Sequence, residues 1–283
     1  FGACYAILND ILPRWGVTTE FVDGTDLDQW RAALATPAKL VFFESPSNPM
    51  LDLVDIPAVA EMAHAAGALV VIDNVFATPI AQKPLELGAD IVIYSATKHI
   101  DGQGRVLGGA VLADEEFIKE RMLKFYRQTG PTISPFNAWV LLKSRETLAL
   151  RVDRQAASAA SLAGWLESRP DIAGLRYPGL PSHPQHELAK RQMSNGGTLL
   201  SFTLAGGKDE AFRVLNALRL IDISNNLGDS KTLACHPGST THSSISAEER
   251  AGMGIADGSI RLSVGLEDVE DLKADLDQAL GRG

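Results

Sequence analysis

A lysine follows an apolar run in a stretch that also contains two hydroxyl side chains. Residues 95–99 read SATKH, and Lys98 comes just after a predicted buried strand. A lysine amine in this position can form a Schiff base with a carbonyl if its pKa is lowered. Ser95 and Thr97 are two positions apart, so in an extended chain both hydroxyls could bind one phosphate. An isolated lysine is more often a solvated strand-end residue, so the interpretation depends on its neighbours.

An aspartate follows the preceding predicted strand. Asp73 comes directly after the apolar residues 68–72, at what should be the same sheet edge as Lys98. Pyridoxal phosphate needs a lysine for its aldehyde, donors for its phosphate and a carboxylate near its pyridine nitrogen. An ionised Asp73 would favour the protonated ring, which better accepts electrons from a substrate carbanion. Alone, Asp73 would more often be a helix cap or turn residue, but with Lys98 it indicates a pyridoxal-phosphate site.

The elements around these residues alternate between buried strands and helices. We predict strands at residues 40–44, 68–72, 91–96 and 109–113. Between the first two, Asp55 is a plausible N-cap for a helix that ends at Gly67. This alternation is typical of an α/β layer with a largely parallel sheet. Ligands bind beyond the carboxyl ends of such strands, where Asn48, Asp73 and Lys98 are all expected.

The pattern changes after a long helical segment at residues 137–166. Its predicted buried face comprises Trp139, Leu142, Leu148, Val152 and Leu162. Beyond it we predict a smaller α+β domain, with strands at 198–204 and 259–264, helices at 208–218 and 269–280, and a capping box at 246–249. We therefore divide the chain into a large domain, residues 1–145, and a small C-terminal domain, residues 146–283.

The composition excludes several classes of protein. The 283 residues are 45% hydrophobic and 22% charged, which is typical of a folded globular chain. The net charge of −9 removes the broad positive field on which nucleic-acid binding relies. No apolar run approaches the ~20 residues that a membrane span requires. Two cysteines, Cys4 and Cys235, are too few for a disulfide framework, and we expect a cytoplasmic location.

Several motifs occur together in the order of one known family. They are ESPSNP at 44–49, IDN at 72–74, SATKH at 95–99, SPFNAW at 134–139, YPGL at 177–180 and IRLSVGLE at 260–267. Over essentially the whole chain they resemble the Cys/Met-metabolism family of fold-type-I pyridoxal-phosphate enzymes. The resemblance implies a transferase-like fold and a homotetramer built as a dimer of dimers. Because the chain opens abruptly at Phe1, we also expect that the N-terminal part of the large domain is missing.

The resemblance implies roles for the residues around the cofactor. Lys98 matches the catalytic lysine that bonds to the cofactor and then shuttles protons. Asp73 matches the partner of the pyridinium nitrogen, and Ser95 and Thr97 match phosphate ligands. Phe1 stands where many members have a tyrosine stacked on the cofactor ring. Since phenylalanine can stack but cannot transfer a proton, proton transfer would depend mainly on Lys98.

The resemblance also implies residues that bind an amino-acid substrate. Asn48 matches an asparagine that contacts the cofactor ring oxygen or the substrate carboxylate. Arg261 matches the arginine that binds that carboxylate, where a bidentate pair fixes orientation as well as charge. A structural salt bridge is the alternative role for Arg261. Asn226 occupies a position that is often serine, which leaves open whether it contacts the carboxylate or the lysine.

The run that follows the lysine indicates a subgroup. Residues 101–109 (DGQGRVLGG) and 225–229 (NNLGD) most resemble members that replace the succinate of O-succinyl-L-homoserine with sulfide at Cγ. That reaction gives homocysteine and succinate, as in methionine biosynthesis. Arg105 is then a candidate ligand for the distal succinate carboxylate or, as we prefer, a member of a structural ion pair.

Other functions stay open as alternatives. Within the family these are the chemistries of cystathionine γ-synthase, O-acetylhomoserine sulfhydrylase and the γ-lyases, because pocket contacts decide the substrate. From another class, the chain could be a cofactor-binding or assembly subunit without catalysis. The histidines at 183 and 186, and Cys235, His236 and His242, lack the spacing of known metal ligands, so we expect no metal. The glycines at 102, 104 and 108 lack the spacing of a dinucleotide site.

Overall fold

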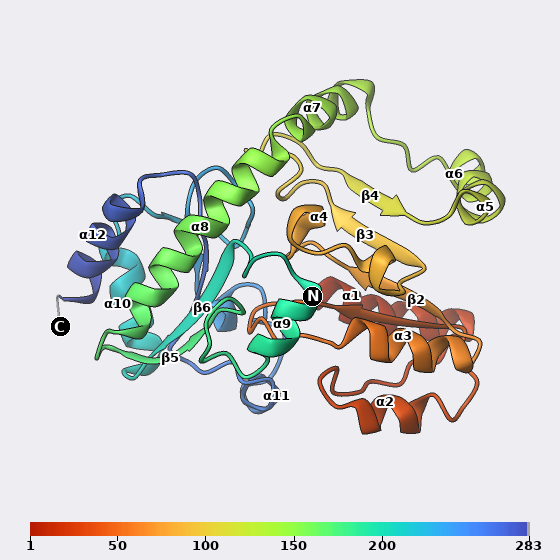
Figure 1. Cartoon of the computed structure of the whole chain (residues 1–283), viewed down its shortest axis with the longest axis horizontal. Coiled ribbons are helices and arrows are strands. Elements are labelled where there is room, and N and C mark those ends of the chain that lie inside the picture. Colours follow the sequence, from red (N-terminus) through yellow and green to blue (C-terminus); the bar gives the residue numbers. More distant parts are fainter. Residues whose placement is uncertain (282–283) are drawn as a thin grey trace.

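The first of two sheets is formed by the four strands predicted in the first half of the chain. A computed structural model describes residues 1–281 (Figure 1). Four strands lie in the order β1 (Leu40–Glu44), β2 (Leu69–Asp73), β3 (Ile91–Ser95) and β4 (Gly109–Leu112). The first three are parallel and β4 is antiparallel to β3, which confirms the expected α/β layer with a largely parallel sheet.

Apolar side chains of helix α3 (Ile56–Ala65) pack on this sheet. The helix begins at Asp55, whose side chain accepts a hydrogen bond from Ala58 N at 3.2 Å, as the sequence predicts. Ile56, Val59 and Ala63 are buried against the first core. The remaining helices and turns of the first half are α1 (Gly2–Ala6), a π-helical turn (Ile7–Ile11), a 3-10 turn (Leu12–Trp15), α2 (Leu27–Ala33), α4 (Thr78–Ala81) and a 3-10 turn (Pro84–Leu87).

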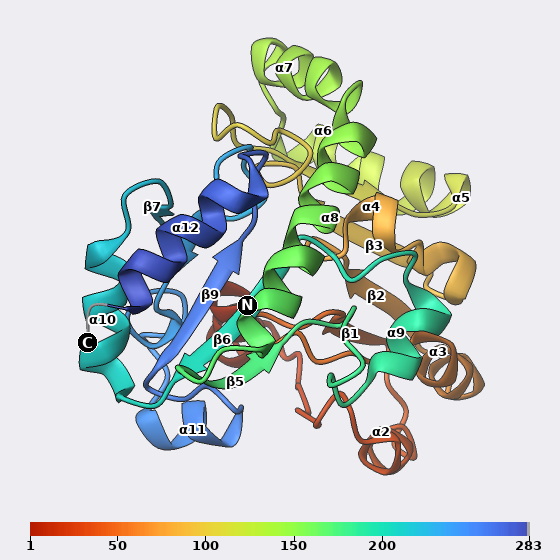
Figure 2. The same ribbon diagram turned by 60° about the vertical axis from the view of Figure 1, so that its left-hand side comes forward.

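The second sheet is mainly antiparallel and has its own core. Its strands lie in the order β5 (Ile172–Arg176), β6 (Leu199–Leu204), β9 (Ser259–Ser263), β8 (Leu233–Cys235) and β7 (Asp222–Ile223). Its core includes apolar residues of these strands and of three helices, α8 (Leu148–Glu167), α10 (Gly207–Ala217) and α12 (Val269–Leu280). Figures 1 and 2 show these helices beside one another against the sheet.

Short elements connect the larger ones. A 3-10 turn (Pro237–Ser239) follows β8, and helix α9 (His186–Gln192) lies between β5 and α3 in Figure 1. Helix α11 (Ala247–Gly252) begins with the predicted capping box of Ser246 and Glu249. Two small apolar clusters join the halves of the molecule, one of them formed by Leu51, Phe76, Leu199 and Leu227.

The long helical segment is two helices, and part of its predicted buried face is wrong. Helix α7 (Pro135–Arg145) ends before α8 begins at Leu148. Leu148, Val152 and Leu162 are buried in α8, but Trp139 is 57% exposed and Leu142 is 53% exposed. The break lets α7 extend away from the core that α8 covers (Figures 1 and 2), so the two helices do not share one face.

The chain between β4 and α7 also lies at the periphery. It contains α5 (Glu115–Phe117), a π-helical turn (Ile118–Leu123) and α6 (Lys124–Thr129). Within residues 1–281, no helix combines the length and the apolar character needed to cross a bilayer.

Candidate active site

The parallel strands bring the predicted residues to one edge of the first sheet. Glu44 and Asp73 end β1 and β2 and are register partners, and Asp73 is paired with Ile93 of β3. The turn with Lys98 follows the end of β3. The expectation that polar strand-end residues gather at one edge is therefore confirmed for Asp73 and Lys98.

A tight turn fixes the backbone of Lys98. The amide of Lys98 donates to Ser95 O at 3.1 Å, and Gly102 N donates to Lys98 O at 2.7 Å. The Lys98 amine donates to Asn226 Oδ1, a residue of the second half of the chain. Burial, and then the positive charge of Arg261, lower the pKa of Lys98. A lowered pKa makes the neutral, nucleophilic amine more accessible at physiological pH.

The Asp73 carboxyl group is in surroundings that disfavour its charge. Burial, followed by the nearby Glu44 carboxylate, raises its pKa from 3.8 to about 6. One carboxylate oxygen accepts a hydrogen bond from Val75 N at 3.0 Å. A cation bound beside Asp73 would reverse this shift, because an opposite charge stabilises the ionised form.

The hydroxyls of Ser95 and Thr97 lie next to the same turn. Ser95 ends β3 and is paired with Gly109 of β4. Thr97 lies beyond the strand, and its hydroxyl accepts from Gly108 N at 3.1 Å and donates to Gly108 O at 3.3 Å. The second of these bonds is long, so the Thr97 hydroxyl proton can be redirected to an anion at modest cost.

Arg261 is a buried cation whose donors go to amide oxygens. It lies on β9 with 1% of its surface exposed. Its guanidinium donates to Asn48 Oδ1 at 3.0 Å and to the carbonyls of Asn225 and Asn226 at 2.9 Å and 3.1 Å. Within residues 1–281 it forms no salt bridge, and its Nε has no hydrogen-bond partner. A buried guanidinium in this condition fits an anionic ligand better than the alternative of a structural salt bridge.

Asn226 connects the lysine to this arginine. Its side-chain oxygen accepts from the Lys98 amine, and its backbone carbonyl accepts from Arg261. Of the two contacts that the sequence leaves open, the Asn226 side chain makes the one with the lysine in this structure. Lys98, Asn226, Arg261 and Asn48 form one continuous set of contacts across both halves of the chain.

The chain as a whole is similar to known proteins. A family model described as Cys/Met metabolism PLP-dependent enzyme matches residues 1–281. The chain belongs to this family.

Within the Cys/Met-metabolism family, the chain is similar to enzymes with several reactions. It is 59% identical to an O-succinylhomoserine sulfhydrylase of Mycobacterium tuberculosis, over 99% of this chain and 70% of that protein. It is 43% identical to an L-methionine γ-lyase of Treponema denticola, over 100% of this chain and 71% of that protein. The crystal structure of cystathionine γ-synthase from Xanthomonas oryzae pv. oryzae superimposes with a TM-score of 0.96 at 38% identity, over 100% of this chain and 73% of that one.

The residues at the strand ends fit the cofactor of this family. Lys98, with its lowered pKa, is suited to bond to the aldehyde of pyridoxal phosphate. The pKa of Asp73 is raised, and a protonated pyridine nitrogen beside it would stabilise its charged form. The Nε of Arg261 can donate to the carboxylate of an amino acid. Together these residues provide the lysine and the carboxylate that the cofactor requires, and a cation for the substrate.

Phe1 and Arg105 are the predicted residues with the weakest geometric support. Phe1 is 58% exposed, and its backbone nitrogen lies 2.5 Å from Glu44 Oε1. The Arg105 Nε donates to Asp101 Oδ1 at 3.0 Å, and Nη2 donates to Ser144 Oγ at 2.5 Å. Asp101 is fully buried, so these contacts favour the structural ion pair over a substrate role for Arg105.

The sequence does not indicate a role for two residues next to this site, Glu44 and Asn74. Glu44 is the neighbour of Asp73 in the sheet and helps to raise its pKa, and its position at the end of an apolar run was the available signal. Asn74 is fully buried, and its side-chain amide donates to Tyr94 Oη and Gln82 O at 2.9 Å each. Nothing in the sequence pairs Asn74 with those partners.

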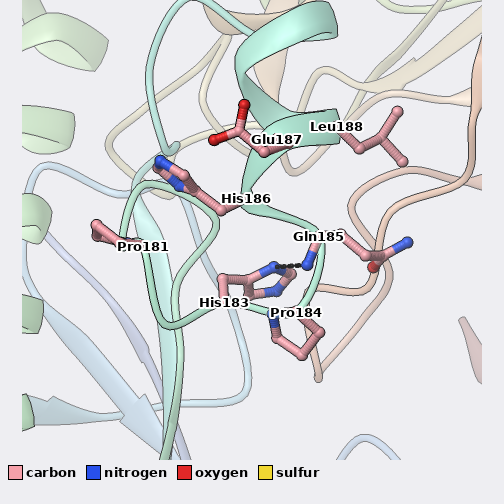
Figure 3. A pocket seen from close by; sticks show the side chains of 7 residues that line it. All are labelled: Pro181, His183, Pro184, Gln185, His186, Glu187 and Leu188. Carbon is pink, nitrogen blue, oxygen red and sulfur yellow. Dashed lines mark hydrogen bonds between the residues drawn. The ribbon is translucent and has the colours of Figure 1, made fainter.

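The histidine pairs of the sequence lie elsewhere. A hollow of about 410 Å³ is lined by residues 181 and 183–188, none of them at the strand ends (Figure 3). His183 there accepts from Gln185 N at 3.1 Å. His236 contacts Ser239 Oγ and Asp257 O. Among residues 1–281, no cluster of three or more histidine, cysteine or acidic side chains is arranged to hold a metal.

Proposed function

We propose that the protein catalyses a pyridoxal-phosphate-dependent γ-replacement, in which O-succinyl-L-homoserine and sulfide give L-homocysteine and succinate. The observation behind this choice is the identity to O-succinylhomoserine sulfhydrylases, 59% and 51% to those of Mycobacterium tuberculosis and Pseudomonas aeruginosa. The sequence identity to the L-methionine γ-lyases is lower, at 43% or less. The reaction fits methionine biosynthesis.

The first task of the site is to hold the amino acid. Arg261 and Asn48 bind and orient the α-carboxylate, with the free Nε of Arg261 as an additional donor. Asn226 contacts both Arg261 and Lys98, so the bound substrate lies within reach of the amine. Ser95 and Thr97 bind the cofactor phosphate, and Phe1 packs on the cofactor ring.

The second task is to move protons at the substrate. When bound, pyridoxal phosphate supplies an electron sink for the negative charge at Cα, and Asp73 favours protonation of its ring nitrogen. Lys98 removes the Cα proton and later returns it, since its lowered pKa provides a neutral amine. Loss of a Cβ proton lets succinate leave Cγ with the electron pair of the broken C–O bond. Sulfide then forms the new C–S bond, and the protons return to Cβ and Cα.

The direct test is product formation by the intact protein loaded with pyridoxal phosphate. With O-succinyl-L-homoserine and sulfide we expect homocysteine and succinate in equal amounts, identified by mass. The Lys98→Ala variant should lose about 10²- to 10⁴-fold in kcat. A γ-lyase would instead release an oxoacid and ammonia without sulfide, and a cystathionine γ-synthase would require cysteine. No homocysteine from the succinyl substrate and sulfide would refute the proposal.

We propose further that the protein acts in the cytoplasm as a homotetramer. Both cysteines are free, as suits a reducing compartment. Exposed apolar side chains at helical spacing on α7 form what we term the α7 apolar face: Phe136, Trp139 and Leu142. A second copy would cover such a face. The separate cores of the two sheets and the break before α8 support the proposed domains, residues 1–145 and 146–283.

A further inference from the structure

Arg151 is a buried arginine that the proposed reaction does not use. It lies in the first turn of α8, with 8% of its surface exposed. Its Nη1 donates to His99 O at 2.8 Å, and its Nη2 donates to Ile100 O at 3.3 Å and Ser144 O at 3.0 Å. Its Nε donates to Thr147 Oγ1 at 3.2 Å. All three guanidinium nitrogens are therefore committed, mostly to backbone carbonyls.

Two of these carbonyls belong to the turn that contains Lys98. In that turn Asp101 N donates to Ala96 O at 2.8 Å, and Gly102 N donates to Lys98 O at 2.7 Å. The turn ends at Gly102. The carbonyls of His99 and Ile100, like those at a helix C-terminus, therefore need hydrogen-bond donors from another part of the chain. Arg151 supplies them from a helix about fifty residues later in the sequence. Figure 1 shows the start of α8 beside the segment that joins β3 to β4.

The turn and the guanidinium are packed so closely that a side chain has no room between them. Gly102 has a φ of +69°, and a Cβ on it would lie 1.9 Å from Arg151 Nη1 and 2.6 Å from Arg151 Cζ. Any residue but glycine would displace the guanidinium or the turn. Glycine at position 102 therefore allows the guanidinium to lie directly against the turn.

The same face of α8 also holds the segment on the other side of the lysine amine. Gln155, one helical turn after Arg151, donates to Asp229 O at 2.7 Å. Ser230 N donates to Gly102 O at 2.7 Å, which ties that segment to the lysine turn. Residues 226–230 include Asn226, the acceptor of the Lys98 amine. Helix α8 thus braces both the turn with Lys98 and the segment with its hydrogen-bond partner.

We propose that Arg151 is a positioning residue that fixes the direction of the Lys98 side chain by bonding the carbonyls of its turn. This inference rests on the proposed role of Lys98 as the proton-transfer group. Without the guanidinium, buried carbonyls lose their donors and the turn relaxes. Proton transfer is sensitive to misplacement of about 1 Å. The carboxylate contacts of Asn48 and Arg261 come from other elements, so substrate affinity is preserved.

The first arm of the test is hydrogen exchange in the intact protein without cofactor. The variants are Arg151→Met and Arg151→Lys, with Arg154→Met, an exposed arginine of the same helix, as the matched control. We expect the Asp101 and Gly102 amides to exchange about tenfold faster or more in both Arg151 variants. Exchange in β6 should stay unchanged. Unchanged exchange at residues 96–104 would overturn the proposal.

The second arm is steady-state kinetics of the loaded enzyme. In Arg151→Met we expect kcat to fall about 10- to 100-fold while KM changes less than about twofold. Arg151→Lys should not restore kcat, because one ammonium group cannot donate to the same set of carbonyls as the planar guanidinium group. Wild-type kcat in Arg151→Lys, or equal changes in kcat and KM, would contradict the proposal. If the wild-type protein forms no homocysteine, the proposed function fails, and the exchange arm still decides the role of Arg151.

Discussion

At the scale of single residues, the active site depends on charges that the protein leaves uncompensated. Asp73 has a raised pKa, and Arg261 is buried without a carboxylate among residues 1–281. Each condition is unfavourable in the chain alone and is relieved by an opposite charge. The site is therefore arranged for a zwitterionic amino acid on a cofactor with a protonated ring.

The raised pKa of Asp73 predicts a pH dependence of stability. Because its pKa is 3.8 in the unfolded chain and about 6 in the fold, Asp73 stabilises the fold most below about pH 4. This contribution, at most about 3 kcal/mol, is lost as the pH rises through 6. We expect Asp73→Asn to lack this loss. Melting temperatures of the cofactor-free proteins at pH 4 and pH 7 test it, and an equal change in both would disprove it.

The contact between Lys98 and Asn226 predicts a shift in the pH profile. In Asn226→Asp a carboxylate would lie beside the amine and raise the pKa of Lys98. The neutral amine then needs a higher pH, so the rising limb of kcat against pH should move up by about one unit. Asn225→Asp, which alters an exposed neighbour, is the control. A profile identical to that of the wild type would show that the contact does not influence the amine.

The sequence predicts this site as far as local signals reach. Asp73 and Lys98 follow apolar runs, and parallel strands bring such residues to one edge. The bond between Arg261 and Asn48 joins residues 213 positions apart, and only the family resemblance could pair them. No pattern links Arg151 to the Lys98 turn either, because a guanidinium on a helix does not signal which distant carbonyls it bonds.

At the scale of elements, helix α8 connects the second core with the active site. Its apolar face is buried in that core, and its first turn holds the lysine turn through Arg151. The sequence predicts the helix and its buried residues after Leu148, since their spacing is helical. For α7 the same spacing gives a wrong prediction of the buried side chains. Two residues separate α7 from α8 and change the direction of the chain, and the spacing of apolar residues does not reveal this break.

The burial of α8 predicts a large stability effect at one position. Leu162 is fully buried, so Leu162→Ala should lower the free energy of unfolding by about 2 to 4 kcal/mol. Leu150, which is 73% exposed on the same helix, is the matched control, and its change to alanine should cost less than about 0.5 kcal/mol. Urea denaturation measures both. Similar values for the two variants would mean that α8 does not pack as described.

At the scale of the whole molecule, the site is built from both halves of the chain. The first sheet contributes Asp73 and Lys98, and the second contributes Arg261. Ser201 of β6 donates to Pro49 O at 2.6 Å and so ties the second sheet to the segment next to Asn48. Catalysis therefore requires the two sheets to keep one relative position.

The α7 apolar face predicts association of several copies. Trp139→Glu places a charge in the middle of this face, and we expect it to reduce the mass measured by light scattering to that of smaller assemblies. Met253→Glu, at an exposed position directly after α11, should leave the mass unchanged. An unaltered mass in Trp139→Glu would show that the face is not an interface between copies.

The most direct test of the central claim is a competition between acyl donors. The intact protein with bound pyridoxal phosphate is given equal concentrations of O-succinyl-L-homoserine and O-acetyl-L-homoserine with sulfide, and the released acids are quantified by mass. The account predicts homocysteine together with an excess of succinate over acetate of about tenfold or more, which corresponds to about 1.4 kcal/mol of discrimination. An excess of acetate, or oxoacid and ammonia in place of homocysteine, would contradict it.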